Sequence, residues 1–213
     1  MSDTPFETMS DTPIVAATDP IVVIEPEPLA VQERNVWTGA RLLVSSTVFL
    51  FVPFVFGYLY LASLNTANLW RPGHLTGPLG WGIAVMLAVV VSAGLVAWAR
   101  SDLSHGKDAS ARWLSLLALL VGIAAVVLQA AEYSQLGFGP SDGGYASVFV
   151  GWTGLFAVVV VGAMVWLEVI VASAFRNGSR APGSGPTDLD ALGFYLVFLA
   201  GLGAVTFAFL YLV

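Results

Sequence analysis

The stretch that decides the fold covers residues 143–175 and reads GGYASVFVGWTGLFAVVVVGAMVWLEVIVASAF. It contains one charged residue, Glu168, and it exceeds the roughly 20 apolar residues that a helix needs to cross a bilayer core. Four further stretches contain no Asp, Glu, Lys, Arg or His and are also long enough to cross: residues 42–70, 75–99, 113–131 and 191–213. The sequence therefore predicts an all-α membrane protein, a bundle of five transmembrane helices.

The composition excludes a soluble globular protein. Of the 213 residues, 57% are hydrophobic and 10% are charged, whereas soluble domains carry about 25% charged residues. The chain contains no cysteine, which excludes disulfides, iron–sulfur clusters and a cysteine nucleophile. Five spans leave little chain for a water-soluble catalytic domain.

The first 35 residues differ from the rest. They contain half of the acidic residues and five prolines, so we expect residues 1–35 to form a disordered acidic tail and residues 36–213 to form the transmembrane domain. The motif MSDTP occurs at residues 1–5 and again at 9–13, which we take as a trivial duplication; the alternative is that Met9 is a second start site. The chain lacks the basic patch of a nucleic-acid-binding protein, so we expect no nucleic-acid partner.

The spans are expected at about residues 41–65, 78–99, 112–132, 145–175 and 190–213. Pro53 lies inside the first and usually kinks such a helix, while Pro78 suits the first turn of the second. Thr187 and Asp190 have the spacing of a capping box ahead of the last helix.

Basic residues predict the orientation. The tail, the second loop and the fourth loop all fall on one side of the membrane and together contain every Lys and Arg except Arg71. Cytoplasmic loops are enriched in Lys and Arg, so we expect the N-terminus inside the cytoplasm and the C-terminus outside.

Small residues every fourth position predict close helix packing. One such stripe is Ala84, Ala88 and Ser92, and the other is Ala200, Ala204 and Ala208.

The spans offer little for catalysis. The interiors of the expected spans contain no Lys, Arg or Cys. They also contain no His, because the two histidines, His74 and His105, fall in loops. Met86 and Met164 are interpreted as packing residues, since haem proteins normally supply a histidine as well. We expect no catalytic, cofactor-binding or metal-binding residues in this chain.

Two carboxyl groups stand out because ionisable groups in lipid are functional candidates. Glu132, beside Gln129 and Tyr133, is interpreted first as a cap at the outer membrane surface. Glu168 lies about 12 Å along a helix from Arg176 and is interpreted first as a snorkelling or helix-paired carboxylate, with proton collection or pairing with a partner as the alternative.

The string LLVGIAAVVLQAAEYSQLGFGPSDGGYASVFVGWTG, residues 119–154, resembles subunit III of the haem–copper cytochrome c oxidases. That family typically closes one helix with Gln and Glu-Tyr, continues through a short loop with Ser-Asp, and opens the next helix with Tyr-Gly-Ser-x-Phe. The matching residues here are Gln129, Glu132, Tyr133, Ser141, Asp142, Tyr145, Ala146, Ser147 and Phe149. The similarity extends over about residues 37–175 and fits the family's shorter, five-helix bacterial form.

Two departures from the family are visible. The buried glutamate that the family usually carries in this first span is matched by Thr47, which we expect to have only a packing role. The two histidines of the family's fourth-helix motif are matched by Phe156 and Val159. The resemblance therefore implies the family's fold and assembly, without those functional residues.

The resemblance implies a non-catalytic subunit of a haem–copper oxidase in the bacterial cytoplasmic membrane. It would stabilise the catalytic subunit I, which holds the haem and copper, contact other subunits, bind lipid, and support aerobic electron transport and proton uptake. The alternatives are a small multi-pass transporter or channel, and a protein that assembles an oxidase or nitric oxide reductase. The polar inventory within the spans (Ser45, Ser46, Thr47, Ser92 and Thr153) is thin for a permeation path.

Overall fold

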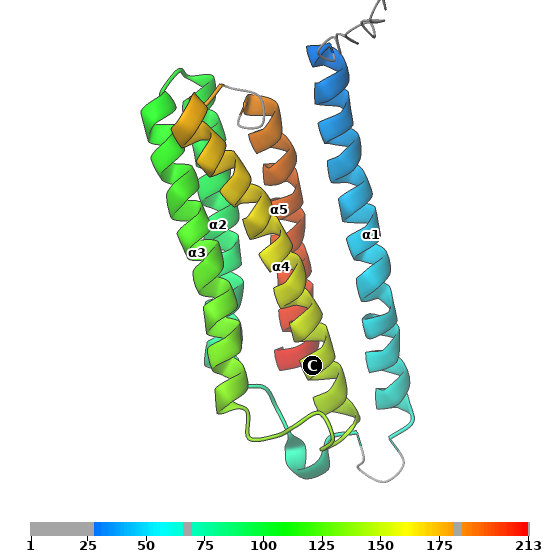
Figure 1. Ribbon diagram of the computed structural model, residues 1–213. Coiled ribbons are helices and arrows are strands. Elements are labelled where there is room, and N and C mark those ends of the chain that lie inside the picture. The colour runs from blue at the N-terminus through cyan, green and yellow to red at the C-terminus, as the bar shows by residue number, and fades with distance from the viewer. Residues whose placement is uncertain (1–27, 66–69, 181–184, 213) are drawn as a thin grey trace, which may run out of the picture.

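The computed structural model describes residues 28–65, 70–180 and 185–212, which form five long helices (Figure 1). These are α1 (Leu29–Ser63), α2 (Leu79–Ser104), α3 (Asp108–Gln135), α4 (Gly144–Asn177) and α5 (Pro186–Phe207). A 3-10 turn, η1 (Pro72–His74), precedes α2, and a π-helical turn, η2 (Ala208–Leu212), follows α5. All five helices are long and apolar enough to cross a membrane, as the sequence predicted.

The first helix begins earlier than expected. Residues 1–27 of the expected tail lie outside the described residues, but residues 29–35 are helical, and α1 continues through Pro53 to Ser63. Pro28 precedes the helix in an extended conformation and the helix starts directly after it. Hydropathy marks only the part of a helix that lies in lipid, whereas Ala, Gln, Glu and Arg in residues 30–34 favour helix in water as well.

The start of α5 also differs from the prediction. Pro186 occupies the first turn, and the Asp188 carboxylate accepts a hydrogen bond from the Gly185 N–H at 3.1 Å. The expected capping box of Thr187 and Asp190 is therefore wrong, because the helix begins four residues before Asp190. Asp190 instead forms an ion pair with Arg100 at the end of α2.

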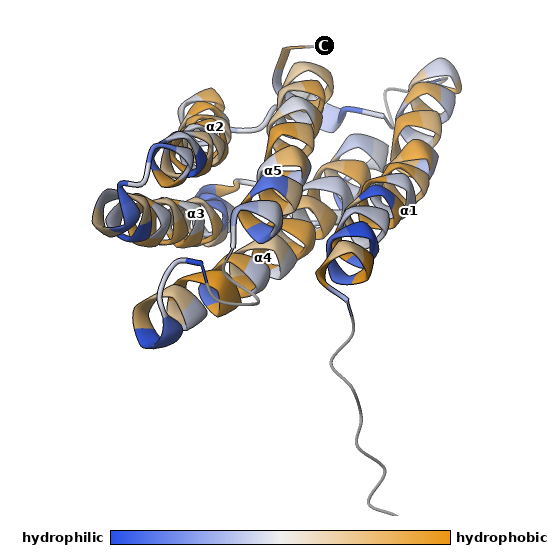
Figure 2. Cartoon of the chain, turned by 90° about the horizontal axis from the view of Figure 1, so that it is seen from above, coloured by the Kyte–Doolittle hydropathy of each residue, from blue (hydrophilic) through white to orange (hydrophobic). Residues whose placement is uncertain are grey.

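The helices form one bundle in which α2 and α3 are an antiparallel pair (Figures 1 and 2). On this pair, α5 packs against α2 and α4 packs against α3, while α1 lies at the edge against α4 and α5. The core is formed largely by α4, whose Tyr145, Phe149 and Trp152 are fully buried. Large apolar side chains such as Phe49 and Phe56 of α1 are exposed, as lipid-facing residues of a membrane protein are.

Two glycines, Gly82 and Gly203, lie at close contacts between elements. A Cβ atom at Gly82 of α2 would lie 2.5 Å from the Tyr211 ring, and one at Gly203 of α5 would lie 3.1 Å from Phe156. In the predicted stripe of α2, Ser92 Oγ donates to the Ala118 carbonyl of α3 at 2.9 Å. In the predicted stripe of α5, however, Ala204 is exposed, and the neighbouring Gly203 makes the close contact instead.

One end of the bundle collects the basic residues. The start of α1, the α2–α3 connection, the end of α4 and the start of α5 lie together at this end, which we call the basic end (Figure 1). Ion pairs join these segments, with Arg100 contacting Asp190 and Arg180 contacting Asp108. The opposite end holds η1, the α3–α4 connection and η2.

Candidate functional site

A buried carboxyl group lies in the last turns of α3, at the end of the bundle opposite the basic end. Glu132 is 0% exposed. Its Oε2 accepts a hydrogen bond from Gln129 Nε2 at 2.6 Å, and its Oε1 accepts one from the Tyr211 hydroxyl at 2.5 Å. We call these three residues the Glu132 cluster. The interpretation of Glu132 as a cap at the membrane surface is wrong, because its side chain is enclosed in the bundle.

The cluster is built from two elements far apart in the sequence. Gln129 and Glu132 are three residues apart on α3, which places them on one face of that helix. Tyr211 comes from the π-helical turn η2 after α5, and its ring lies against the backbone of α2 at Gly82. Sequence reasoning found the two α3 residues but missed Tyr211. The available signal was a tyrosine in an apolar span, whose buried hydroxyl needs a partner.

Tyr133 belongs to a separate hydrogen-bond link between α3 and α4. Its hydroxyl lies 2.8 Å from Thr153 Oγ1, which itself donates to the Phe149 carbonyl at 2.7 Å. Since the Thr153 hydrogen is used in that bond, Tyr133 is the donor to Thr153. Of the three residues that sequence analysis singled out at this end of α3, the structure thus brings Gln129 and Glu132 together, whereas Tyr133 bonds to Thr153 of α4.

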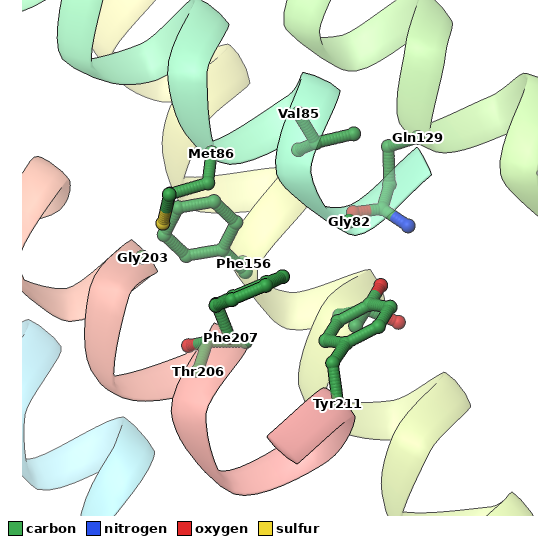
Figure 3. A pocket seen from close by; sticks show the side chains of 10 residues that line it. Gly82, Val85, Met86, Gln129, Phe156, Gly203, Thr206, Phe207 and Tyr211 are labelled. Carbon is green, nitrogen blue, oxygen red and sulfur yellow. The ribbon is translucent and has the colours of Figure 1, made fainter. Parts of the chain in front are cut away.

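A small cavity lies beside the Glu132 cluster (Figure 3). Its volume is about 20 Å³, enough for one water molecule. Gln129 and Tyr211 line it together with Thr206, while Phe156 and Phe207 supply apolar walls (Figure 3). Thr206 Oγ1 also accepts a hydrogen bond from Trp152 Nε1 at 2.8 Å. The cavity can hold a water, but it is too small for a solute.

The η2 turn is held in place by residues of the loop before α2 and the start of α4. The Tyr145 hydroxyl donates to the Leu210 carbonyl at 2.5 Å and accepts from the Gly77 N–H at 3.2 Å. The Arg71 guanidinium lies 4.2 Å from the centre of the Tyr145 ring and donates to the Tyr58 hydroxyl at 3.2 Å. These contacts fix the position of Tyr211 and therefore the geometry of the Glu132 cluster.

Thr47 lies far from this cluster, on the face of α1 that packs against α5. It is 2% exposed, and its hydroxyl donates to the Leu43 carbonyl at 2.8 Å. The Tyr195 hydroxyl of α5 lies 3.1 Å from the same Thr47 oxygen and donates to it. The Thr47 hydroxyl therefore joins α1 to α5 and also bonds within α1. Sequence reasoning missed Tyr195, because no local pattern identifies the helix that packs against Thr47.

Glu168 lies on the outer surface of α4 and is exposed. It lines an apolar groove between α3 and α4 rather than a polar site in the bundle. Within residues 28–65, 70–180 and 185–212 its carboxylate makes no hydrogen bond or ion pair, so the helix-paired interpretation is not supported there.

The Glu132 cluster offers hydrogen bonds between helices. Among the described residues, no three His, Asp or Glu side chains lie close enough together to hold a metal ion. His105 lies in the α2–α3 connection, where Nδ1 contacts the Ser101 carbonyl at 2.6 Å. The Glu132 cluster can clamp α3 to the end of α5 and hold a proton or a water molecule between them.

Comparison with known proteins found a matching family model and related proteins of the same name. Residues 27–179 match the model of the family described as cytochrome c oxidase subunit III. The cytochrome c oxidase subunit 3 of Rattus norvegicus is 27% identical over 150 residues, which cover 68% of this chain and 54% of the rat protein. The proteins of that name from Xenopus laevis and Danio rerio are 29% identical over 143 residues and 30% identical over 142 residues. These matches cover 64% of this chain and 55% and 54% of the two relatives, so the chain spans about half the length of the curated relatives it matches.

Proposed function

Because this chain belongs to the cytochrome c oxidase subunit III family, we propose that it serves as a non-catalytic, multi-pass membrane subunit of a haem–copper terminal oxidase. The observation that carries the proposal is the match over residues 27–179, which contains α1 to α4 complete. In this role the chain stabilises the catalytic subunit I, contacts further subunits, binds lipid, and supports proton uptake during aerobic electron transport.

The haem and copper of this assembly belong to the catalytic subunit in our proposal. Several features of the chain support this division of labour. The sequence contains no cysteine, its two histidines fall outside the five helices or at their ends, and Thr47, Phe156 and Val159 stand where the family carries polar side chains. The cavities beside the Glu132 cluster, about 20 and 10 Å³, have the size of single water molecules and give little support to a transporter.

We further propose that the N-terminus faces the cytoplasm of a bacterial cell and the C-terminus faces outside. The basic end of the bundle supports this orientation, because cytoplasmic loops are enriched in Lys and Arg. A reporter fused after Val213 should be active only outside the cytoplasm. Activity of that reporter in the cytoplasm would contradict the orientation.

The proposed function is tested by purifying the full chain from its own membranes in a mild detergent. We expect a haem-containing large subunit to copurify, identified by mass spectrometry and reduced-minus-oxidised spectra, and the separated chain to show no Soret band. A preparation without a haem protein would refute the assignment to an oxidase. Loss of the chain from the fully active oxidase would indicate an assembly protein rather than a permanent subunit.

A further inference from the structure

An apolar groove runs along the outer surface between α3 and α4. It has a volume of about 190 Å³ and is lined by Leu119, Ile123 and Val127 of α3 and by Val161, Val165 and Glu168 of α4. We call it the α3/α4 groove. Because the two helices are antiparallel, Glu168 lies toward the basic end of the groove, and Val161 and Val127 lie toward the other end.

The position of Glu168 on its helix makes snorkelling to the nearer membrane surface difficult. Side chains on an α-helix lean toward the helix N-terminus, and the N-terminus of α4 lies at the end of the bundle away from the basic end. The side chain therefore leans along α4 away from the basic end of the bundle. Its Cα is eight residues before Arg176, about 12 Å along the helix.

A carboxylate on the outer, apolar surface of a membrane-spanning helix needs a donor, and the described residues do not supply one. It makes no hydrogen bond or ion pair with them, and its neighbours in the α3/α4 groove are apolar. A charged group facing hydrocarbon is destabilising by several kcal/mol, and such residues normally pair with another group. Lipid headgroups carry their donors at the membrane surface, whereas a transmembrane helix can place a donor at any depth.

The surface around Glu168 also suits a helix. Ala172, one turn further along α4, is exposed and small, which allows the backbone of a neighbouring helix to approach closely. Val127 and Val165 are 61% and 54% exposed, so large apolar side chains of a neighbour can insert between them.

We propose that the α3/α4 groove docks a transmembrane helix of another polypeptide, which presents a basic or hydrogen-bond-donating side chain to Glu168. The proposal rests on the proposed function and deepens it, since it names the surface on which a partner of the oxidase assembly sits.

The test uses a photo-reactive phenylalanine analogue at Val165, in the full chain within the detergent-purified assembly. A matched control carries the analogue at Val205 of α5, which is 43% exposed but lies outside the groove. We expect the Val165 probe, and not the control, to form an adduct with a transmembrane segment of another polypeptide. Mass spectrometry of the adduct should find a basic or hydrogen-bonding residue within one helical turn of the cross-linked position.

The same cross-link is then measured in two Glu168 variants, both of which should fold because the side chain is exposed. Glu168→Leu should lower the yield about threefold to tenfold, as expected for one hydrogen bond between membrane helices, whereas Glu168→Gln should retain most of it. An unchanged yield in Glu168→Leu, or adducts only with lipid or with a second copy of this chain, would overturn the proposal.

Haem spectra of the same preparation separate the two proposals. If a haem protein copurifies without a cross-link at Val165, the docking surface is wrong and the oxidase assignment stands. If the cross-link forms on a helix without a haem protein present, the oxidase assignment is wrong and the docking surface stands.

Discussion

Replacing Tyr211 by phenylalanine should destabilise the bundle by removing one buried hydrogen bond between α3 and the turn after α5. Tyr211→Phe removes the donor to Glu132 Oε1 at 2.5 Å and leaves Gln129 as the remaining donor to that carboxyl. The ring contacts survive, because the phenylalanine ring keeps its place beside Phe149 and Phe207, whose centroids lie 5.4 and 5.2 Å away. The substitution therefore isolates the hydrogen bond.

Two magnitudes bear on the size of the effect. Leaving a buried polar group without its partner costs about 1–3 kcal/mol in soluble proteins. Hydrogen bonds between membrane helices contribute less, about 0.6 kcal/mol on average and at most about 1.7, because the unfolded chain in the membrane also finds partners. Glu132 is 0% exposed, which places it at the upper end of the membrane range. We expect Tyr211→Phe to lower the free energy of unfolding by about 1–1.7 kcal/mol.

The measurement is reversible unfolding of the full chain in mixed micelles of a mild detergent and sodium dodecyl sulfate, followed by helical circular dichroism. The matched control is Tyr60→Phe, which removes the hydroxyl of a tyrosine that is 51% exposed on α1. We expect the control to change the free energy of unfolding by less than about 0.5 kcal/mol. In a chain that already carries Glu132→Leu, Tyr211→Phe should lower the free energy of unfolding by about 1 kcal/mol less than it does in the unchanged chain, because the Glu132 carboxyl that accepts the hydrogen bond is absent.

Equal unfolding free energies for Tyr211→Phe and Tyr60→Phe would refute the reasoning. So would strict additivity of Tyr211→Phe and Glu132→Leu, since two residues that share a hydrogen bond must show coupling.

Three further predictions follow from the same contacts. Gly82→Ala should lower the free energy of unfolding by about 1–3 kcal/mol, because the new Cβ meets the Tyr211 ring; Gly80→Ala, with open space at that position, should be neutral in the same unfolding assay. Thr47→Val should lower the free energy of unfolding by about 0.5–1.5 kcal/mol through the lost link to α5, while turnover of the proposed oxidase assembly stays unchanged; a sharp fall in proton uptake would contradict the packing role. In the separated chain, where no partner helix covers the α3/α4 groove, a hydrophobic carbodiimide should label the exposed Glu168 before the enclosed Glu132, and peptide mapping should find no label in the membrane-spanning part of α1.

The helices could be predicted from sequence because hydropathy reports directly on contact with lipid. The number of spans and the segregation of Lys and Arg to one end were both visible before the structure. The ends of α1 and α5 were not, since a helix continues into water wherever its residues allow, as at Leu29 and Pro186. An uninterrupted apolar run contains no signal for where the helix leaves the lipid.

Sequence analysis predicted the two α3 residues of the Glu132 cluster but not its third member, Tyr211. Gln129 and Glu132 stood out as polar residues at the end of a span, but sequence alone did not tell whether they face headgroups or the bundle. That choice depends on Tyr211, and Tyr211 reaches Glu132 only because the chain turns through η2 and because Gly82 leaves room for the ring. Both conditions are contacts between distant segments, which local patterns do not encode.

By the resemblance, Thr47 and Phe156 stand where the family usually carries more polar side chains, and the structure shows how each fits in this chain. Thr47 keeps a polar contact between α1 and α5 through Tyr195, although it cannot carry a proton as a glutamate can. Phe156 fills its position with an apolar ring, which fits because Gly203 has no side chain. A hydrogen bond between helices thus accommodates Thr47, and close packing accommodates Phe156. A fold and its functional residues can be inherited separately, so family membership accounts for the helices of this chain, while the contacts of Thr47 and Phe156 account for the residues found at these two positions.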